Sequence, residues 1–522
     1  MKNRTPGGAL IWSIAALAAP VAILGSGLAA AQSPATTPAA AAAGAAPGGE
    51  SPAGAAATPQ DPFTVKNLIG DAVSLSNQTY PEVESALQRF KNSDAVGARE
   101  YLEQAKKKYP KLPPVDLLLA KLMVFNRNGE QARALLEQTV TNHPADPEAY
   151  LLLADLAFAE GRTTEAQALF EKAKGLVDAF AENEKRKAAF QIRVLAGTSA
   201  VHERRQKWNE AIQLLTQWAQ LDPESAAAHT RLGITQFRLK KPAEALAEFK
   251  KARELEPASS HPFVMLGQLF TQEQNLDQAR KSFEQAYKED GKNEATSRAY
   301  AEWLIQQNEL DKAQQVAAAM RTNQPQSVAA LMLDGLVAKM RNQPEAAEQS
   351  LTKVLSLDPS NAGATNLLAL ILSESSNPAQ QEKALRYAQV NAERFATNSQ
   401  ANITLAWILA KLNRPAESDQ FLTKAVQAGN LNADSAYLVA KILVQKNQKE
   451  NAAKALEQVL AQAGAGMFMY RKEAEALLKE LGGTVPAPQA SPGAATPPAQ
   501  GAAAAPAATG ATTPTARQTT GQ

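Results

Sequence analysis

Histidine can move protons and bind metals, so the four histidines are the first candidates for chemistry in this 522-residue chain. They are His143, His202, His229 and His261, and none has a second histidine four residues further on. A zinc site needs three or four converging ligands. We therefore interpret the four as packed or solvated side chains, with His261 alone expected on an exposed inner face. No metal site is predicted.

Nucleophilic chemistry is equally poorly supported. The chain contains no cysteine, which excludes disulfides, thiolate nucleophiles and thiolate metal ligands. It also lacks a P-loop, a Gly-x-Ser-x-Gly elbow and a glycine-rich dinucleotide turn. Carboxylates are numerous, but helices use glutamate for propensity and solubility. We predict no catalytic residue and no cofactor, and an enzyme or enzyme subunit is the weakest functional hypothesis.

One segment concentrates basic side chains. It contains Lys185, Arg186, Lys187, Arg193, Arg204, Arg205 and Lys207, with Glu182, Glu184 and Glu203 interleaved. Two interpretations stay open: a solvated face of long helices, which we favour, and a site for an anion or an acidic partner. The formal net charge is only +2, whereas nucleic-acid binders usually carry a clear basic stripe. We predict no nucleic-acid partner.

The elements that carry these residues come from an internal repeat of 34 residues. Eleven units begin at Thr79, Pro113, Pro147, Ile192, Ala226, Ser260, Glu294, Val328, Ala362, Ser399 and Ala433. Positions 8 and 20 of each unit are always Ala, Gly or Ser, and position 24 is Leu or Phe in nine units. Two helices approach closely only where both carry small residues. A fixed period of this length is typical of a stacked solenoid.

The pattern resembles the tetratricopeptide repeat (TPR) family. Units 226–259 and 260–293 match it best, and the second has Phe263, Leu266, Gly267, Phe270, Ala279, Phe283 and Ala286 at the family positions. The resemblance implies an all-α fold, a right-handed superhelical solenoid of about eleven helix-turn-helix repeats over residues 79–466. It also implies a concave groove, lined by the first helix of each unit, that binds a peptide or protein partner.

Besides the repeats, the part of the chain that we expect to fold contains two insertions and two flanking segments. Eleven extra residues, Ala181–Gln191, predict longer helices between the third and fourth units, and three extra residues fall in the loop within Ser373–Gln381. The ends of a solenoid need a polar outer face. We therefore expect an N-terminal capping helix within 61–78 and a C-terminal capping helix at 467–481.

The two ends of the chain have a different composition. Lys2 and Arg4 precede the uncharged apolar run Leu10–Ala31, and Ala29–Ala31 fits a small-residue cleavage site. Residues 1–31 are predicted to be a secretory signal peptide. An uncleaved inner-membrane anchor at residues 10–31 stays open as the alternative. Residues 32–60 and 482–522 are rich in Ala, Pro and Thr with few large apolar side chains, which predicts disordered tethers.

Partner binding is the function that remains, and the inner positions of the first helices provide its candidate residues. In the C-terminal half these positions are mainly apolar and aromatic, and the predicted contacts are Phe237, Met332, Leu336, Met340, Ile403, Trp407 and Tyr437. Exposed Trp and Tyr are favoured binding anchors. Large aromatics are also often buried, so core packing and partner contact both stay open for Trp407 and Tyr437.

These observations favour a non-catalytic protein–protein interaction scaffold in the bacterial cell envelope, in the periplasm or secreted. The alternative is an accessory subunit of an envelope polysaccharide-export or outer-membrane assembly machine. A membrane is expected as a partner only through an uncleaved N-terminal segment. The sequence does not identify the protein partner.

Overall fold

The computed structural model describes residues 61–486, apart from 71, 74, 76, 77, 430 and 463–466. These residues form helices and connecting loops, without a strand. The predicted signal peptide (1–31), the linker (32–60) and the tail beyond residue 486 lie outside this range. The predicted all-α fold is confirmed.

Each repeat supplies two helices, and a short helix stands before and after the repeats. The first helices are α3 (Pro81–Lys91), α5 (Val115–Phe125), α7 (Pro147–Ala159), α9 (Glu184–Arg204), α11 (Ala226–Arg238), α13 (Pro262–Gln272), α15 (Glu294–Gln306), α17 (Val328–Met340), α19 (Ala362–Ser373), α21 (Ser399–Lys411) and α23 (Ala433–Gln445). The second helices are α4 (Ala95–Lys108), α6 (Gly129–Asn142), α8 (Thr163–Ala179), α10 (Trp208–Leu221), α12 (Pro242–Leu255), α14 (Leu276–Asp290), α16 (Leu310–Asn323), α18 (Pro344–Leu357), α20 (Pro378–Arg394), α22 (Pro415–Ala428) and α24 (Lys449–Gln462). The flanking helices are α2 (Val65–Ile69) and α25 (Arg471–Glu480).

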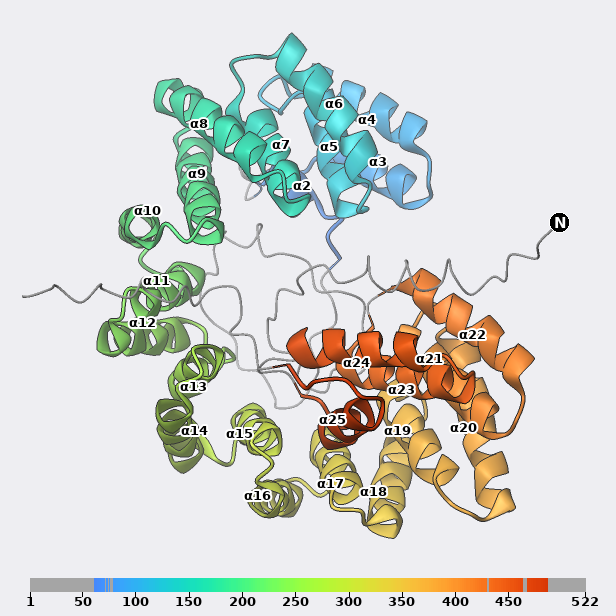
Figure 1. Cartoon of the computed structure of the whole chain (residues 1–522). Coiled ribbons are helices and arrows are strands. Elements are labelled where there is room, and N and C mark those ends of the chain that lie inside the picture. The colour runs from blue at the N-terminus through green and yellow to red at the C-terminus, as the bar shows by residue number, and fades with distance from the viewer. Residues whose placement is uncertain are drawn as a thin grey trace, which may run out of the picture.

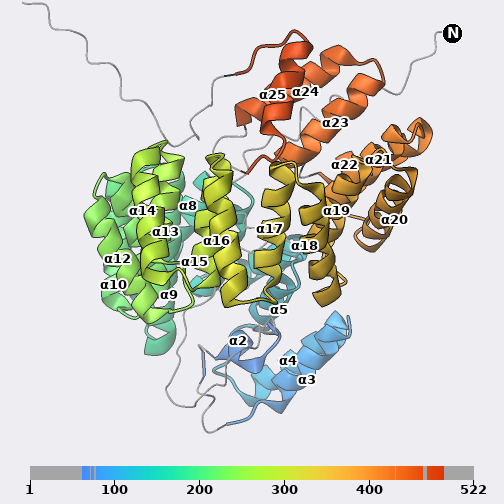
Figure 2. The ribbon, with the colours of Figure 1, turned by 90° about the horizontal axis from the view of Figure 1, so that it is seen from below.

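The repeats form a right-handed superhelix. Figure 1 shows them following one another around an arc, and in the middle repeats, from α9 to α20, the first helix of each pair lies on the inside and the second on the outside. In the perpendicular view of Figure 2, the N-terminal and C-terminal repeats are displaced along the axis of this arc. The inside of the arc is the concave face that the TPR resemblance predicts.

The predicted repeat frame agrees with the helices. Seven first helices begin at the predicted first residue of their unit, and α3, α5 and α13 begin two residues later. The exception is α9, which begins at Glu184 and is 21 residues long because the insertion extends it backwards. The three-residue insertion behaves differently from our expectation. It mainly lengthens α20 to 17 residues, because proline at Pro378 is compatible with a helix start.

The small-residue columns mark a close contact between the two helices of a unit. A Cβ atom placed on Gly233 would lie 2.4 Å from the Phe249 ring and 3.0 Å from the Ala245 carbonyl oxygen. A Cβ on Gly267 would lie 2.7 Å from the Phe283 ring. Position 8 therefore contacts position 24 of the same unit. The side chain at position 24 and the backbone at position 20 occupy the space beside position 8. A large residue at position 8 would collide with them.

The turn between the two helices of a unit has a conformation that the sequence did not indicate. Position 15 has φ between 56° and 63° in nine units, at Ser93, Arg127, Gln206, Lys240, Gln274, Asn308, Asn342, Asn413 and Asn447. Gly161 occupies the same position with φ 79°. The left-handed region is unfavourable for residues that carry a Cβ atom. Nine units therefore retain a local strain at this turn.

Arg127→Gly should relieve this strain. The left-handed conformation costs about 1–2 kcal/mol for a residue with a Cβ atom, and the greater freedom of glycine in the unfolded chain offsets part of the gain. We expect a net stabilisation of about 0.5–1 kcal/mol, measured by chemical denaturation. Arg127→Ala is the matched control, because it removes the same exposed side chain and keeps the strain. Equal stability of the two variants would contradict the argument.

Ala279→Leu should destabilise the sixth repeat. Ala279 is fully buried in α14, and overpacking of this kind costs about 1–3 kcal/mol. Local opening is expected around this repeat, because each unit contacts only its neighbours; hydrogen exchange measures it. Lys281→Leu, at an exposed position of the same helix, is the control that adds a leucine without overpacking. An unchanged exchange profile for Ala279→Leu would mean that the repeat frame is misplaced.

Candidate functional site

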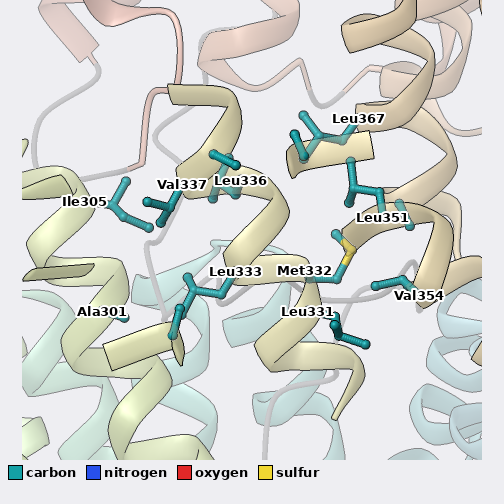
Figure 3. Close-up of a cluster of buried hydrophobic side chains, with 14 of the residues drawn as sticks. Ala301, Ile305, Leu331, Met332, Leu333, Leu336, Val337, Leu351, Val354 and Leu367 are labelled. Carbon is teal, nitrogen blue, oxygen red and sulfur yellow. The ribbon is translucent and has the colours of Figure 1, made fainter. Parts of the chain in front are cut away.

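The predicted contact residues of α17 lie between neighbouring repeats. Figure 3 shows Met332 beside Leu351 and Val354 of α18. The Met332 Cε atom also lies 3.4 Å from the position that a Cβ on Gly363 would take. Met332 is 6 % exposed and Leu336 is 4 % exposed, whereas Met340 is only partly buried. Of these three, only Met340 is partly accessible.

Two other predicted contacts belong to the packing of the solenoid. Phe237 is 2 % exposed, and its ring meets Phe270 of the next repeat edge-to-face at 4.9 Å between centroids. Ile403 is fully buried. Neither side chain is available to a partner in this conformation, so the structure places both among the residues that hold adjacent repeats together.

The two aromatic residues for which packing and contact stayed open are also buried. Trp407 is 7 % exposed and Tyr437 is 6 % exposed. The structure thus favours the core interpretation. Cations lie over both rings, since the Lys441 Nζ atom is 4.7 Å from the Trp407 centroid and 5.8 Å from that of Tyr437. Lys411 approaches Trp407 at 5.9 Å. A lysine over an aromatic face is a stabilising arrangement.

The cover over Tyr437 comes from outside the repeats. Tyr470, just before α25, stacks on Tyr437 with 4.9 Å between ring centroids and 27° between planes. The preceding residues Met467, Phe468 and Met469 pack against the same two apolar clusters that contain Met332, Leu336 and Trp407. We call Met467–Tyr470 the C-terminal strap. Sequence reasoning missed its role, although two aromatics and two methionines in four residues were a signal.

The N-terminal flanking segment covers the other end of the concave face. Phe63 lies 5.8 Å from Phe90 of α3 and 6.1 Å from Phe125 of α5 between ring centroids. Helix α2, which contacts both of these first helices, buries Leu68 and Ile69 completely. Within the predicted capping segment 61–78, the structure has one helix of five residues.

This segment is also fastened to the fourth repeat. The Asn183 side-chain amide donates to the Ala72 carbonyl oxygen at 2.8 Å, and Lys185 donates to the Gly70 carbonyl oxygen at 2.9 Å. Both donors lie at the start of α9, the helix that the insertion lengthens. The N-terminal segment thus spans the inner side from the first repeat to the fourth.

The basic segment around α9 is partly solvated, since Lys185, Arg204 and Lys207 are exposed, but its Arg186 is buried and paired. Arg186 is 5 % exposed and pairs with Glu148 at 2.6 Å and Asp146 at 3.1 Å. Lys121 reaches the same Glu148 at 2.9 Å. Both expectations for Arg186 are therefore wrong, because its acidic partners lie at the start of α7, Glu148 within the helix and Asp146 just before it.

Other basic residues of this segment contact α7 and α8. Arg193 pairs with Asp155 at 2.7 Å. The Arg204 guanidinium lies 3.7 Å from the Phe158 centroid, and Arg205 donates to Gln167 and Thr164. Arg193 is thus neutralised by a carboxylate, whereas Arg204 and Arg205 contact neutral groups of the third repeat.

The ion pairs control the ionisation of Glu148. Burial alone would raise the pKa of this carboxyl, but the charges of Lys121, Arg186 and Arg193 outweigh burial and lower the pKa to about 2. Asp146 behaves differently, because burial raises its pKa more than Arg186 lowers it. Glu148 therefore stabilises the fold at neutral pH through its charge.

Histidine chemistry gains no support. His261 is buried rather than exposed, with 8 % of its surface accessible, and burial lowers its pKa. Its Nδ1 atom accepts from the Phe263 backbone N–H at the start of α13. Among the described residues, no three His, Cys, Asp or Glu side chains are arranged to hold a metal ion.

Glu148→Gln should destabilise the N-terminal repeats in a pH-dependent way. Removing one partner of a buried ion pair costs about 3–5 kcal/mol, and this loss is expected at pH 7. The folded-state pKa of Glu148 lies below its unfolded value, so its contribution is present above about pH 4.5 and is lost as the pH falls toward 2.

Urea denaturation at pH 7 and pH 3 measures this effect. The wild type should lose more stability than Glu148→Gln between the two pH values. Glu137→Gln is the control, because Glu137 is 61 % exposed at its side chain and 3.8 Å from Arg133, and surface pairs contribute only about 0–1 kcal/mol. Parallel pH profiles for the wild type and Glu148→Gln would contradict the assignment.

A comparison with known protein families finds matches within the repeats. The sequence model of the tetratricopeptide repeat family matches residues 89–156, 130–175, 204–266 and 270–334. No curated protein matches the chain. In the described part of the chain, no helix combines the length and apolar character needed to cross a membrane.

Three solved structures are similar to parts of this chain. A tetratricopeptide repeat protein from Parabacteroides merdae is 17% identical, with a TM-score of 0.39, covering 49% of this chain and 98% of that one. Yeast Tom70 is 14% identical, with a TM-score of 0.37 and coverages of 76% and 94%. MamA is 19% identical, with a TM-score of 0.27 and coverages of 33% and 94%.

The family assignment rests on the matched repeat sequences and on the paired helices that repeat with the same frame, not on these three structures. Residues 89–175, 204–266 and 270–334 therefore match tetratricopeptide repeats.

Proposed function

We propose that this protein is a non-catalytic scaffold of the bacterial cell envelope that binds a peptide or protein partner on the concave face of its superhelix. TPR repeats are protein–protein interaction modules. The observation that carries the proposal is that repeats and their two flanking segments use almost all of the described chain. A solenoid of this kind presents an extended concave surface.

The envelope location is supported by the sequence of the N-terminus. A charged start with Lys2 and Arg4, the apolar run Leu10–Ala31 and the small residues before Gln32 together have the order of an export signal. Cysteine is absent from the chain, which is compatible with an oxidising compartment in which unpaired thiols would be reactive.

The location predicts a defined mature protein. After expression of the full chain in a bacterium, we expect the periplasmic fraction to contain protein that begins at Gln32, identified by N-terminal sequencing. Replacing Leu10–Ala31 with a polar segment of equal length should retain the protein in the cytosol. Unprocessed wild-type protein in the cytosolic fraction would refute the envelope location, and unprocessed protein in the membrane fraction would favour the anchor.

The scaffold function predicts a concave-face dependence of partner capture. Tagged full-length protein should capture specific envelope proteins, identified by mass spectrometry. Met340→Glu, which alters an accessible residue of α17, should reduce capture more than tenfold if it removes an anchor contact, as anchor losses commonly do.

Val390→Glu is the matched control. Val390 is 51 % exposed and lies on α20, a second helix on the outside of the arc (Figure 1). Circular dichroism verifies that both variants remain helical. Equal capture by Met340→Glu and Val390→Glu would exclude this part of the concave face as the binding surface.

A further inference from the structure

The C-terminal strap contacts helices that lie far apart in the chain. Tyr470 stacks on Tyr437 of α23, while the Lys339 Nζ atom of α17 lies 5.6 Å from the Tyr470 ring centroid. Helices α17 and α23 belong to the eighth and eleventh repeats. The strap therefore bridges the concave side of the last four repeats rather than contacting the final repeat alone.

The strap is held through its backbone as well as its rings. The Tyr470 backbone N–H donates to the Asp434 Oδ1 atom at 3.1 Å. The Met469 backbone N–H also favours the ionised Asp434, although burial is the larger effect and raises the pKa of this carboxyl to about 6. Phe468 and Tyr470 are 7 % and 6 % exposed. The strap ends in a turn that leads into α25, in which the Arg471 backbone N–H donates to the Phe468 carbonyl oxygen at 3.3 Å.

The capping of the last repeat does not require the strap. Helix α25 packs on α24, and its Ala474 and Leu478 are fully buried. These two residues cover the apolar end of the solenoid, as a capping helix must. A cap needs to contact only the last repeat. Tyr470 also contacts Lys339, which lies in the eighth repeat.

The surroundings of the strap carry charges of both signs. Lys339 pairs with Glu374 at 2.6 Å, and Lys411 and Lys441 lie over the Trp407 ring. Burial lowers the pKa of Lys441, and the negative charges of Glu374 and Glu473 oppose this shift. Glu473, three residues after Tyr470, thus supplies part of the negative charge that these lysines attract.

We propose that the concave face of the last four repeats is a receptor for a partner peptide that presents two aromatic residues separated by one residue, and that Met467–Tyr470 occupies this receptor until such a peptide displaces it. The inference rests on the proposed scaffold function and specifies its ligand chemistry. Phe468 and Tyr470 show the pattern that fits. Their rings pack against Tyr437 and the apolar cluster of Trp407, and the Tyr470 backbone N–H donates to Asp434.

The test uses the full chain and a synthetic, fluorescein-labelled peptide with the sequence of residues 467–481. In the wild type, the attached segment competes at an effective concentration of about millimolar. The Phe468→Ala, Tyr470→Ala double variant should therefore bind the peptide at least tenfold more tightly than the wild type, measured by fluorescence anisotropy. The control variant Lys472→Ala, Lys479→Ala changes two exposed residues of α25 and should bind as the wild type does.

Two further measurements separate a displaceable ligand from a fixed cap. A peptide with alanine at the positions of Phe468 and Tyr470 should bind the double variant at least tenfold more weakly. Hydrogen exchange should show that α23 and α24 keep their protection in the double variant. Loss of protection in these helices, or equal binding of both peptides, would overturn the proposal.

Lys339→Ala tests the strap without touching the last repeat. It should increase hydrogen exchange in residues 467–470 and leave α23 and α24 unchanged. Unchanged exchange in the strap would contradict the proposed bridge. None of these measurements requires an envelope partner, so their failure leaves the capture experiment intact, and a failed capture experiment leaves the peptide result standing.

Discussion

The close contact between the two helices of each repeat is the constraint on which the rest of the structure depends. At Gly233 and Gly267 there is no room for a Cβ atom, because the rings of Phe249 and Phe283 lie where it would be. Each pair of helices is thereby fixed as a unit with one inner and one outer helix. Stacking identical units adds a constant rotation, which produces the superhelix and its concave face.

This constraint also explains what the sequence could predict. Small and large residues recur at fixed positions, so the frame of the repeats followed from residue type alone. The left-handed turn residue was not found, because Ser93, Arg127 and Gln274 share a backbone conformation and no chemical property. The burial of Trp407 and Tyr437 was left open for a related reason. For Tyr437 it depends on the approach of Tyr470, which stacks on it from outside the repeats.

The junction of the third and fourth repeats shows how an insertion is accommodated. The lengthened α9 places Arg186 against Glu148 and Asp146, which lie 38 and 40 residues earlier. A run of basic residues seemed exposed in the sequence because its partners are distant along the chain. Buried ion pairs add little net stability, because desolvation opposes the attraction, but an unpaired buried charge is strongly unfavourable. The pairs therefore fix the position of α9 on α7.

The polarity of the concave face varies along the superhelix, because the two flanking segments cover its two ends. The N-terminal segment covers the inner side from α3 to α9, through Phe63 and the bonds from Asn183 and Lys185. The strap covers apolar surface between α17 and α23. Between them the inner side is more polar, with Arg238 bonded to Gln272 at 2.7 Å. A partner that binds through apolar anchors must therefore meet the strap, because the apolar part of the concave face is where the chain has placed its own aromatic residues.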